Sequence, residues 1–252
     1  MPPQPSSARP FSGETAIVTG AGRGIGRAIA RTFAEAGATV VLASRTPGEL
    51  DRTAEEIARV GGRAIAHPAD VTRKADMEAL VRRAIDATGG IDILVNNAGV
   101  FVMKTLAELE EAEWDRVLST NLKSAYLLIH AALPSLRRSA RGRILNIASI
   151  HATVGEESVV AHCAAKFGLV GLTKALASEL REAGITVNAI CPGSTESEAP
   201  DGAPRLHTAP LVEKLNDEDV AAAALFLASP AAAAITGAVL DVWGGTRVEI
   251  RS

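Results

Sequence analysis

Residues Thr19 to Gly26, which read T-G-A-G-R-G-I-G, have the types and spacing of a phosphate-binding turn. An apolar run at residues 15–18 precedes them and apolar residues at helical spacing follow, which predicts a strand, a glycine turn and a helix in that order. Glycines let the backbone bend sharply and approach a pyrophosphate, whose charge then lies at the positive end of the new helix. A glycine cluster alone can also be a tight turn without a ligand, so its function depends on the rest of the chain.

Short uncharged runs alternate with helical patterns after this turn. The predicted strands are residues 15–18, 40–43, 64–66, 91–95, 144–148, 187–190 and 239–242. The predicted helices are residues 25–36, 47–60, 75–88, 114–133, 159–182 and 217–228. This alternation predicts a single α/β domain of the Rossmann type, a doubly wound parallel sheet with helices on both faces. We expect residues 1–11 to form a disordered tail and residues 12–252 to form the nucleotide-binding domain.

The composition argues against several classes of partner. With 26 basic and 29 acidic residues in 252, the chain has no excess of charge for nucleic acid or an acidic membrane surface. Residues 220–240 are uncharged, but Pro230 and Gly237 interrupt them, so a helix, a turn and a strand explain them better than a membrane span. Two cysteines, Cys163 and Cys191, suit a reducing compartment, and the start lacks a signal peptide, so we expect a cytoplasmic protein.

Five motifs follow one another in the order and spacing of a known family. They are T-G-A-G-R-G-I-G at residues 19–26, D-V at 70–71, N-N-A-G at 96–99, P-G at 192–193 and I-T-G at 235–237. From about Ser12 to Val248 the chain resembles the short-chain dehydrogenase/reductase family, and it looks most like the branch typified by 3-oxoacyl-acyl-carrier-protein reductases. The resemblance implies hydride transfer between a nicotinamide cofactor and a small-molecule carbonyl or alcohol substrate.

The resemblance also implies which residues bind the cofactor. They are Gly20, Arg23, Gly24, Ile25, Gly26, Ser44, Arg45, Asp70, Val71, Asn97, Ala98, Gly99, Lys166, Pro192 and Gly193. In members that select NAD(H) an acidic residue ends the second strand and binds the adenosine ribose, whereas this chain has Ser44 followed by Arg45. A hydroxyl beside a guanidinium can bind a ribose 2′-phosphate, and Arg23 can add a second cation. We therefore expect NADP(H) rather than NAD(H), the alternative being that both arginines are merely solvated.

Four positions carry the reaction in this family: an asparagine, a serine, a tyrosine and a lysine. Asn121, Ser149 and Lys166 match three of them, but the tyrosine position holds His162. This is not a misalignment, because the only tyrosine, Tyr126, belongs to another predicted helix and has no lysine four residues later. By the resemblance, the tyrosine passes a proton to the carbonyl oxygen, the lysine lowers its pKa and holds the nicotinamide ribose, the serine steadies the oxygen, and the asparagine orders a relay water.

Histidine in the tyrosine position leaves three interpretations open. His162 acts as the acid/base, directly or through a water, since the ordinary pKa of histidine is about 6.5. Alternatively, the nucleotide site serves other, non-redox chemistry, or the substitution is an inactivating one. His162 and Lys166 are four residues apart and share a helix face, as the pair in the family does. The shorter ring and the charge of Lys166, which disfavours an imidazolium, oppose a simple exchange. We favour the first interpretation.

The remaining histidines and cysteines are not expected to bind a metal. His130, His151, His162 and Cys163 include no pair at the i, i+4 spacing that zinc-binding helices use. His151, two residues after Ser149, can instead line the pocket.

Two further segments bear on the substrate pocket and on assembly. Residues 194–216 are shorter and more loop-like than the helical lid of the family, which predicts a pocket that is open or closed by a partner subunit.

The family pairs its two long helices across subunits, and the matching residues 114–136 and 159–182 are apolar on more than one face. We therefore expect a homo-oligomer, a dimer or a tetramer.

Overall fold

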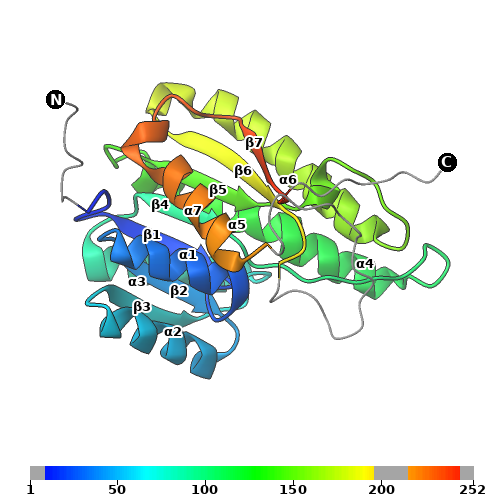
Figure 1. The fold of residues 1–252 in the computed structure, drawn as a ribbon, viewed down its shortest axis with the longest axis horizontal. Coiled ribbons are helices and arrows are strands. Elements are labelled where there is room, and N and C mark those ends of the chain that lie inside the picture. Colours follow the sequence, from blue (N-terminus) through cyan, green and yellow to red (C-terminus); the bar gives the residue numbers. More distant parts are fainter. Residues whose placement is uncertain (1–8, 196–214, 245–252) are drawn as a thin grey trace.

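The computed structural model describes residues 9–195 and 215–244, which form a seven-stranded sheet with helices on both faces (Figure 1). The strands are β1 (Thr15–Thr19), β2 (Thr39–Ser44), β3 (Arg63–Pro68), β4 (Ile93–Asn96), β5 (Arg143–Ile147), β6 (Thr186–Pro192) and β7 (Val239–Val242). They lie in the order β3-β2-β1-β4-β5-β6-β7, and all neighbours are parallel. The order runs outward from β1 in one direction and from β4 in the other, which confirms the predicted doubly wound α/β fold.

Helices cover both faces because each strand sends alternate side chains to opposite sides of the sheet. The helices are α1 (Gly24–Glu35), α2 (Pro47–Arg59), α3 (Lys74–Thr88), α4 (Glu111–Leu118), α5 (Ser124–Leu136), α6 (Val160–Glu179) and α7 (Asp217–Ala228). Val18 packs into a core shared with α1, α2 and α7, whereas its neighbour Ile17 packs into a core shared with α3, α5 and α6. In Figure 1, α1 and α7 lie in front of the sheet. Burial on both faces explains the uncharged runs in the sequence.

The long helix predicted for residues 114–133 is interrupted near its middle. A π-helical turn, Ser119–Lys123, joins α4 to α5. Such turns insert an extra residue into a helix and occur frequently at functional sites. Asn121 lies inside this turn and is buried.

The packed part of the chain begins before residue 12. Phe11, which the sequence pattern places in a tail of residues 1–11, is fully buried and packs edge-on against Phe33, with 5.1 Å between the ring centroids. Its backbone N–H donates to the Ala36 carbonyl at 3.0 Å. Residues 1–8 of that tail, and residues 196–214 of the segment compared with the lid of the family, lie outside the described residues.

Within the part of the chain that the structure describes, α6 is the one helix long and apolar enough to cross a membrane by length and composition alone. A core helix passes the same test, and α6 packs against β6 and against the π-helical turn. Ala165 and Leu169 on its inner face are completely or almost completely buried. Residues 220–240 form most of α7, a turn and the start of β7, in agreement with the sequence pattern.

Candidate functional site

The turn after β1 needs glycine at several positions. Gly20 and Gly24 have φ angles of 65° and 55°, in the left-handed region that favours glycine. A Cβ atom on Gly26 would lie 2.2 Å from the Gly20 carbonyl oxygen and 2.4 Å from Asn97 Nδ2, which is closer than these atoms can approach. The glycines therefore permit both the turn itself and its close packing against the next loop.

The amino end of α1 follows this turn directly. Its N-cap residue, Arg23, makes no side-chain capping hydrogen bond, and its first turn contains no acidic residue. By contrast, α4 and α7 satisfy their first N–H groups with capping boxes. Ile25 is buried in the core and anchors the helix start. The first N–H groups of α1 lack a side-chain cap and lie next to a turn without side chains, so they can bind the pyrophosphate of a dinucleotide cofactor.

Hydrogen bonds join the glycine turn to the N-N-A-G motif after β4. The Thr19 hydroxyl accepts from the backbone N–H groups of Asn97 at 3.0 Å and Ala98 at 3.1 Å. In return, the Asn97 side-chain amide donates to the Thr19 carbonyl at 2.9 Å. Gly99 continues this loop toward Asn121. Because the strand order reverses between β1 and β4, these residues lie where doubly wound sheets bind ligands.

The residues expected at the adenosine end gather after β2 and β3, which are neighbours in the sheet. Ser44 ends β2, and the exposed Arg45 follows it. Asp70 and the buried Val71 follow β3. Burial raises the pKa of Asp70, but hydrogen bonds from Thr72 and the charge of Arg45 outweigh this and leave the pKa below its ordinary value. Arg45 and an ionised Asp70 therefore share one edge of the sheet.

Glu49, which sequence reasoning missed, lies at the same edge. A Cβ atom on Gly22 would be 2.9 Å from Glu49 Oε2 and 3.3 Å from Ser44 Oγ, so the carboxylate and the hydroxyl face one point of the glycine turn. A carboxylate in this position favours ribose hydroxyls and repels a 2′-phosphate. Glu49 lies in the first turn of α2, where acidic residues are common, so the sequence carried no local signal of this contact.

At the chemical end of the site, Asn121 clamps the backbone of Val100. Its Oδ1 accepts from the Val100 N–H, and its Nδ2 donates to the Val100 carbonyl, both at 2.8 Å. The same Nδ2 lies 3.4 Å from Nδ1 of His162. The π-helical turn thus brings Asn121 next to both the loop after β4 and His162.

His162 and Lys166 lie on the buried face of α6, with only 8% and 5% of their surfaces exposed. Lys166 Nζ donates to the Ile147 carbonyl at the end of β5 at 2.7 Å. Burial, followed by the charges of Lys166 and His151, lowers the pKa of His162 to about 3. His162 is therefore a neutral imidazole at neutral pH.

Ser149 and His151 lie next to this pair, just after β5. Ser149 Oγ accepts from the His151 backbone N–H at 3.2 Å and lies 3.4 Å from His151 Nδ1. His151 Nε2 lies 2.5 Å from Glu156 Oε2. The His151 ring is 5.5 Å from the His162 ring in an edge-on arrangement, and Phe101 packs 4.9 Å from His162. Sequence reasoning placed His151 in the pocket wall but did not identify Glu156 as its partner.

The P-G motif lies on the same edge of the sheet as Ser149. Pro192 ends β6, and the N–H of Gly193 donates to the carbonyl of Val242, the last residue of β7, at 3.0 Å. β5 and β6 are paired neighbours, and Ala148 N–H donates to the Ile190 carbonyl at 2.7 Å. All of the sequence-predicted site residues thus lie at the carboxyl ends of the strands or on the turns and helices beside them.

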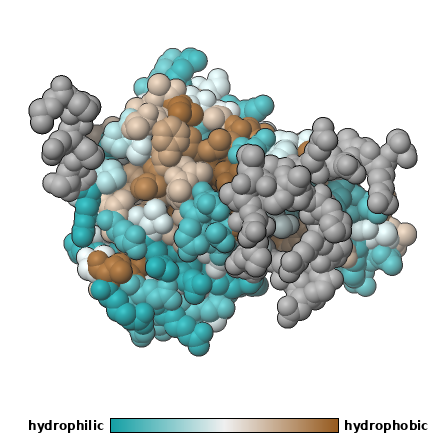
Figure 2. Space-filling view, in the orientation of Figure 1, coloured by the Kyte–Doolittle hydropathy of each residue, from teal (hydrophilic) through white to brown (hydrophobic). Residues whose placement is uncertain are grey.

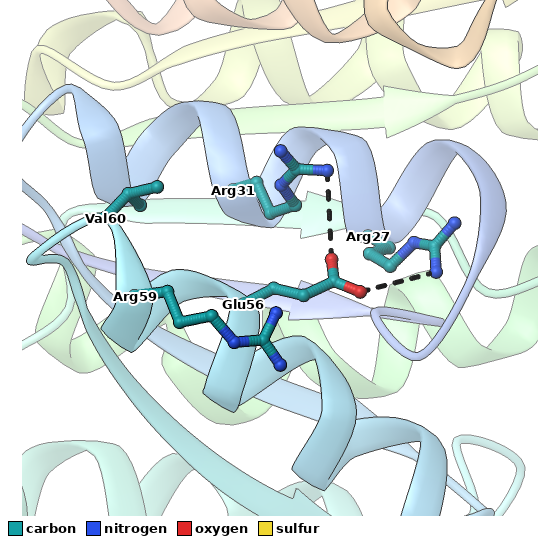
Figure 3. A pocket seen from close by; sticks show the side chains of 5 residues that line it. All are labelled: Arg27, Arg31, Glu56, Arg59 and Val60. Carbon is teal, nitrogen blue, oxygen red and sulfur yellow. Dashed lines mark ion pairs between the residues drawn. The ribbon is translucent and has the colours of Figure 1, made fainter.

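Other parts of the described chain offer weaker candidates. Between residues 9 and 195 and between 215 and 244, no group of three histidine, cysteine or acidic side chains is placed to hold a metal ion. A cleft of about 400 Å³ lies between α1 and α2 and is lined by Arg27, Arg31, Glu56, Arg59 and Val60 (Figure 3). Arg27 and Arg31 point toward Glu56, at 3.8 and 3.7 Å. These guanidiniums already face a carboxylate of the protein, so we place the candidate site at the strand ends.

Comparisons with known proteins point in the same direction. The family described as short chain dehydrogenase matches residues 14–204. A D-β-hydroxybutyrate dehydrogenase of Rhizobium meliloti is 39% identical over 92% of this chain and 98% of its own length. A 3-oxoacyl-[acyl-carrier-protein] reductase of Vibrio harveyi is 37% identical over 93% of this chain and 98% of its own. The solved structure of a 7α-hydroxysteroid dehydrogenase, complexed with NADH and 7-oxo glycochenodeoxycholic acid, is 34% identical with a TM-score of 0.92, covering 99% of this chain and 100% of that one.

Proposed function

The chain belongs to the short-chain dehydrogenase/reductase family, an NAD(P)-dependent oxidoreductase family, and from this premise we propose that it transfers hydride between NADP(H) and a carbonyl or alcohol substrate. One observation carries the proposal: the glycine turn after β1 and the residues around His162 lie at the same edge of the sheet and are connected by hydrogen bonds. The glycine turn is hydrogen-bonded to the loop after β4, and that loop is clamped by Asn121 beside His162. A cofactor seated on the turn would therefore reach the residues that can handle a proton.

Each of the chemical residues has a proposed role. A bound nicotinamide supplies or accepts the hydride. Lys166, held by the Ile147 carbonyl, holds the cofactor ribose, and Asn121 fixes the loop that borders the pocket. Ser149 donates a hydrogen bond to the substrate oxygen. The sequence predicts an acid/base at His162, but its pKa of about 3 restricts it to acting as a neutral hydrogen-bond partner of that oxygen near neutral pH.

The choice of NADP(H) rests on the charges after β2. Arg45, with Ser44 beside it and Arg23 at the start of α1, supports binding of a ribose 2′-phosphate. Glu49 has the opposite effect, since its carboxylate faces Ser44 across the glycine turn. Arg45 and Arg23 are balanced in number by Glu49 and the ionised Asp70, so the preference for NADP(H) over NAD(H) in this proposal rests on the pairing of the Arg45 guanidinium with the Ser44 hydroxyl.

A second candidate function follows from the neutral state of His162. A site that binds the dinucleotide but lacks a proton donor in the tyrosine position can serve non-redox chemistry, or bind without turnover. Steady NADPH consumption with a panel of carbonyl compounds supports the oxidoreductase. The panel should include a 3-oxoacyl compound and, with NADP⁺, β-hydroxybutyrate, because two of the relatives are named for these compounds. Tight NADPH binding without consumption of any compound in the panel would support the second candidate.

We also propose that the protein is a cytoplasmic homo-oligomer, a dimer or tetramer. Tyr126 on α5 and Phe167 on α6 are large apolar side chains that are 51% and 47% exposed. On another face, apolar residues gather over α7, where Phe226 is 46% exposed, whereas the region over α1 and α2 is hydrophilic (Figure 2). Exposed apolar faces of this kind are typical of subunit contacts. A monomer mass by light scattering at micromolar concentration would contradict the assembly.

A further inference from the structure

A continuous chain of polar contacts leads away from Ser149. Ser149 Oγ lies 3.4 Å from one ring nitrogen of His151, Nδ1, and the other ring nitrogen, Nε2, lies 2.5 Å from Glu156 Oε2. A hydroxyl, an imidazole and a carboxylate are thus connected in series. The three residues lie within eight positions of one another, between β5 and α6.

The carboxylate determines where the imidazole carries its proton. An ionised carboxylate only accepts hydrogen bonds, so Nε2 of His151 must be the donor to Glu156. In the neutral ring Nδ1 then has a free lone pair and accepts from the Ser149 hydroxyl. When the ring gains a second proton, Nδ1 becomes a donor to Ser149 Oγ, and the negative charge of Glu156 compensates the imidazolium. His151 can therefore exchange a proton with Ser149 without changing either contact.

The series of contacts from Ser149 through His151 to Glu156 also reaches solvent. The His151 side chain is 13% exposed, and the Glu156 side chain is 33% exposed. His162, in contrast, is buried, and its ring is enclosed by Phe101, His151 and the Asn121 amide. Burial and the Lys166 charge lower the pKa of His162 to about 3, which opposes proton donation from that ring. Of the two histidines in contact, His151 is the one with a route for protons.

We propose that His151, positioned by Glu156, exchanges the proton of the reaction with solvent through the Ser149 hydroxyl. The inference rests on the oxidoreductase function proposed above. In reduction, the carbonyl carbon gains the hydride that a bound reduced nicotinamide supplies, the C=O double bond becomes a single bond, and the substrate oxygen takes the Ser149 hydroxyl proton. This step starts from His151 as the imidazolium, whose Nδ1–H donates to Ser149 Oγ while the Ser149 hydroxyl donates to the substrate oxygen. Ser149 Oγ then takes the proton from His151 Nδ1, which leaves the ring neutral with its proton on Nε2, and the ring regains its second proton from solvent. In oxidation the same proton moves outward along this path.

Three variants test the relay by turnover. His151→Phe keeps the ring packed against Phe101 and His162 but removes both nitrogens, and it should lower kcat roughly 10²-fold. Glu156→Gln keeps the side-chain size but removes the charge, and it should lower kcat roughly 10-fold with KM unchanged. Glu157→Gln is the matched control, since it removes the same charge from the exposed neighbouring residue and should leave kcat unchanged. A wild-type kcat in His151→Phe overturns the relay while the oxidoreductase function stands.

Nitrogen NMR of the histidine rings in the cofactor-free protein tests the relay independently of turnover. The neutral His151 ring should carry its proton on Nε2, and Glu156→Gln should shift its ring-nitrogen signals while Glu157→Gln should not. A proton on Nδ1, or equal responses to both substitutions, overturns the geometry on which the relay depends. No turnover in the wild-type protein, together with the expected NMR result, contradicts the proposed function instead and removes the relay's reaction with it.

Discussion

In the proposed site, the turns after β1 and β4 offer backbone groups to a ligand, whereas the segment after β5 and helix α6 offer side chains. In the first region, Gly20, Gly24 and Gly26 matter because they lack side chains, and hydrogen bonds hold the turn against Asn97. In the second region, the identity and protonation state of His162 and His151 determine what can happen.

This difference has a practical consequence. The backbone of the glycine turn tolerates almost no added atom, whereas a side-chain site can hold a different side chain while its neighbours keep their contacts. Asn121, Ser149 and Lys166 keep their contacts around a histidine that stands where the family resemblance expects tyrosine. We therefore expect substitutions that add volume in the glycine turn to weaken cofactor binding strongly. Substitutions around His162 and His151 should act mainly through the charges and protons that they add or remove.

Gly26→Ala should have the largest effect. Its Cβ would lie 2.2 Å from the Gly20 carbonyl oxygen, so the turn must shift, which should cost about 1–3 kcal/mol of unfolding free energy. A displaced turn should weaken NADPH binding at least about 10²-fold by calorimetry. Gly90→Ala is the control, because its Cβ would meet only Ser135 Oγ at 3.9 Å. Equal NADPH affinity in the two variants would contradict the role of the turn.

His162 should make the protein less stable in acid. Its folded-state pKa of about 3 lies below the unfolded value of about 6.5, so the unfolded state binds more protons between these pH values. The contribution of the neutral His162 to the free energy of unfolding is therefore fully present above about pH 6.5. It decreases as the pH falls toward about pH 3, and about 2 kcal/mol of it is lost by pH 5.

Chemical denaturation at neutral pH and at about pH 5 measures this loss. His162→Gln should lose about 2 kcal/mol less than the wild type over that interval, because the glutamine side chain does not titrate. His130→Gln, at an exposed position on α5, should lose as much as the wild type. A parallel pH dependence of His162→Gln and wild type would rule out a buried neutral His162.

His162→Tyr should raise carbonyl reduction roughly 10-fold, because a phenol beside Lys166 is a better-placed acid. The gain should stay below the roughly 10²–10⁴-fold worth of a new acid, since the relay through His151 already supplies a proton. When it is combined with His162→Tyr, His151→Phe should lower kcat much less than it does in the wild-type protein. His162→Ala should keep NADPH binding and lower turnover by about 10-fold or less, the usual worth of one neutral hydrogen bond. If His162→Tyr and His162→Ala both abolish turnover, the imidazole has a chemical role of its own.

The smallest effect is expected for cofactor preference. Arg45→Ala should lower the NADPH/NADH preference roughly 2–5-fold, the usual worth of one exposed charge pair. Glu49→Gln should raise it by a similar factor, because it removes the carboxylate that faces Ser44. Arg52→Ala, at an exposed position on α2, is the control and should leave the NADPH/NADH preference unchanged. An unchanged ratio in both Arg45→Ala and Glu49→Gln would place the adenosine end elsewhere.

The sequence alone determined the fold, and it predicted the residues of the proposed site. Runs such as Val40–Ala43 and the glycines at 20, 24 and 26 carry local signals, because strand burial and turn geometry depend on nearby residues. The observed elements agree with the predicted ones within about three residues, apart from the π-helical turn. Within that turn Asn121 is hydrogen-bonded to Val100, 21 residues away, and a contact at this separation leaves no local pattern in the sequence.

Only the tertiary structure decided the electrostatics of the site. The sequence predicted His162 as the acid/base and also that the charge of Lys166 would disfavour an imidazolium there, but burial on α6, the largest cause of the lowered pKa of His162, follows only from the fold. The contact of Glu49 with the glycine turn and the pairing of His151 with Glu156 were likewise absent from any motif. Charge states depend on desolvation and on neighbours from distant elements, and these exist only once the chain has folded.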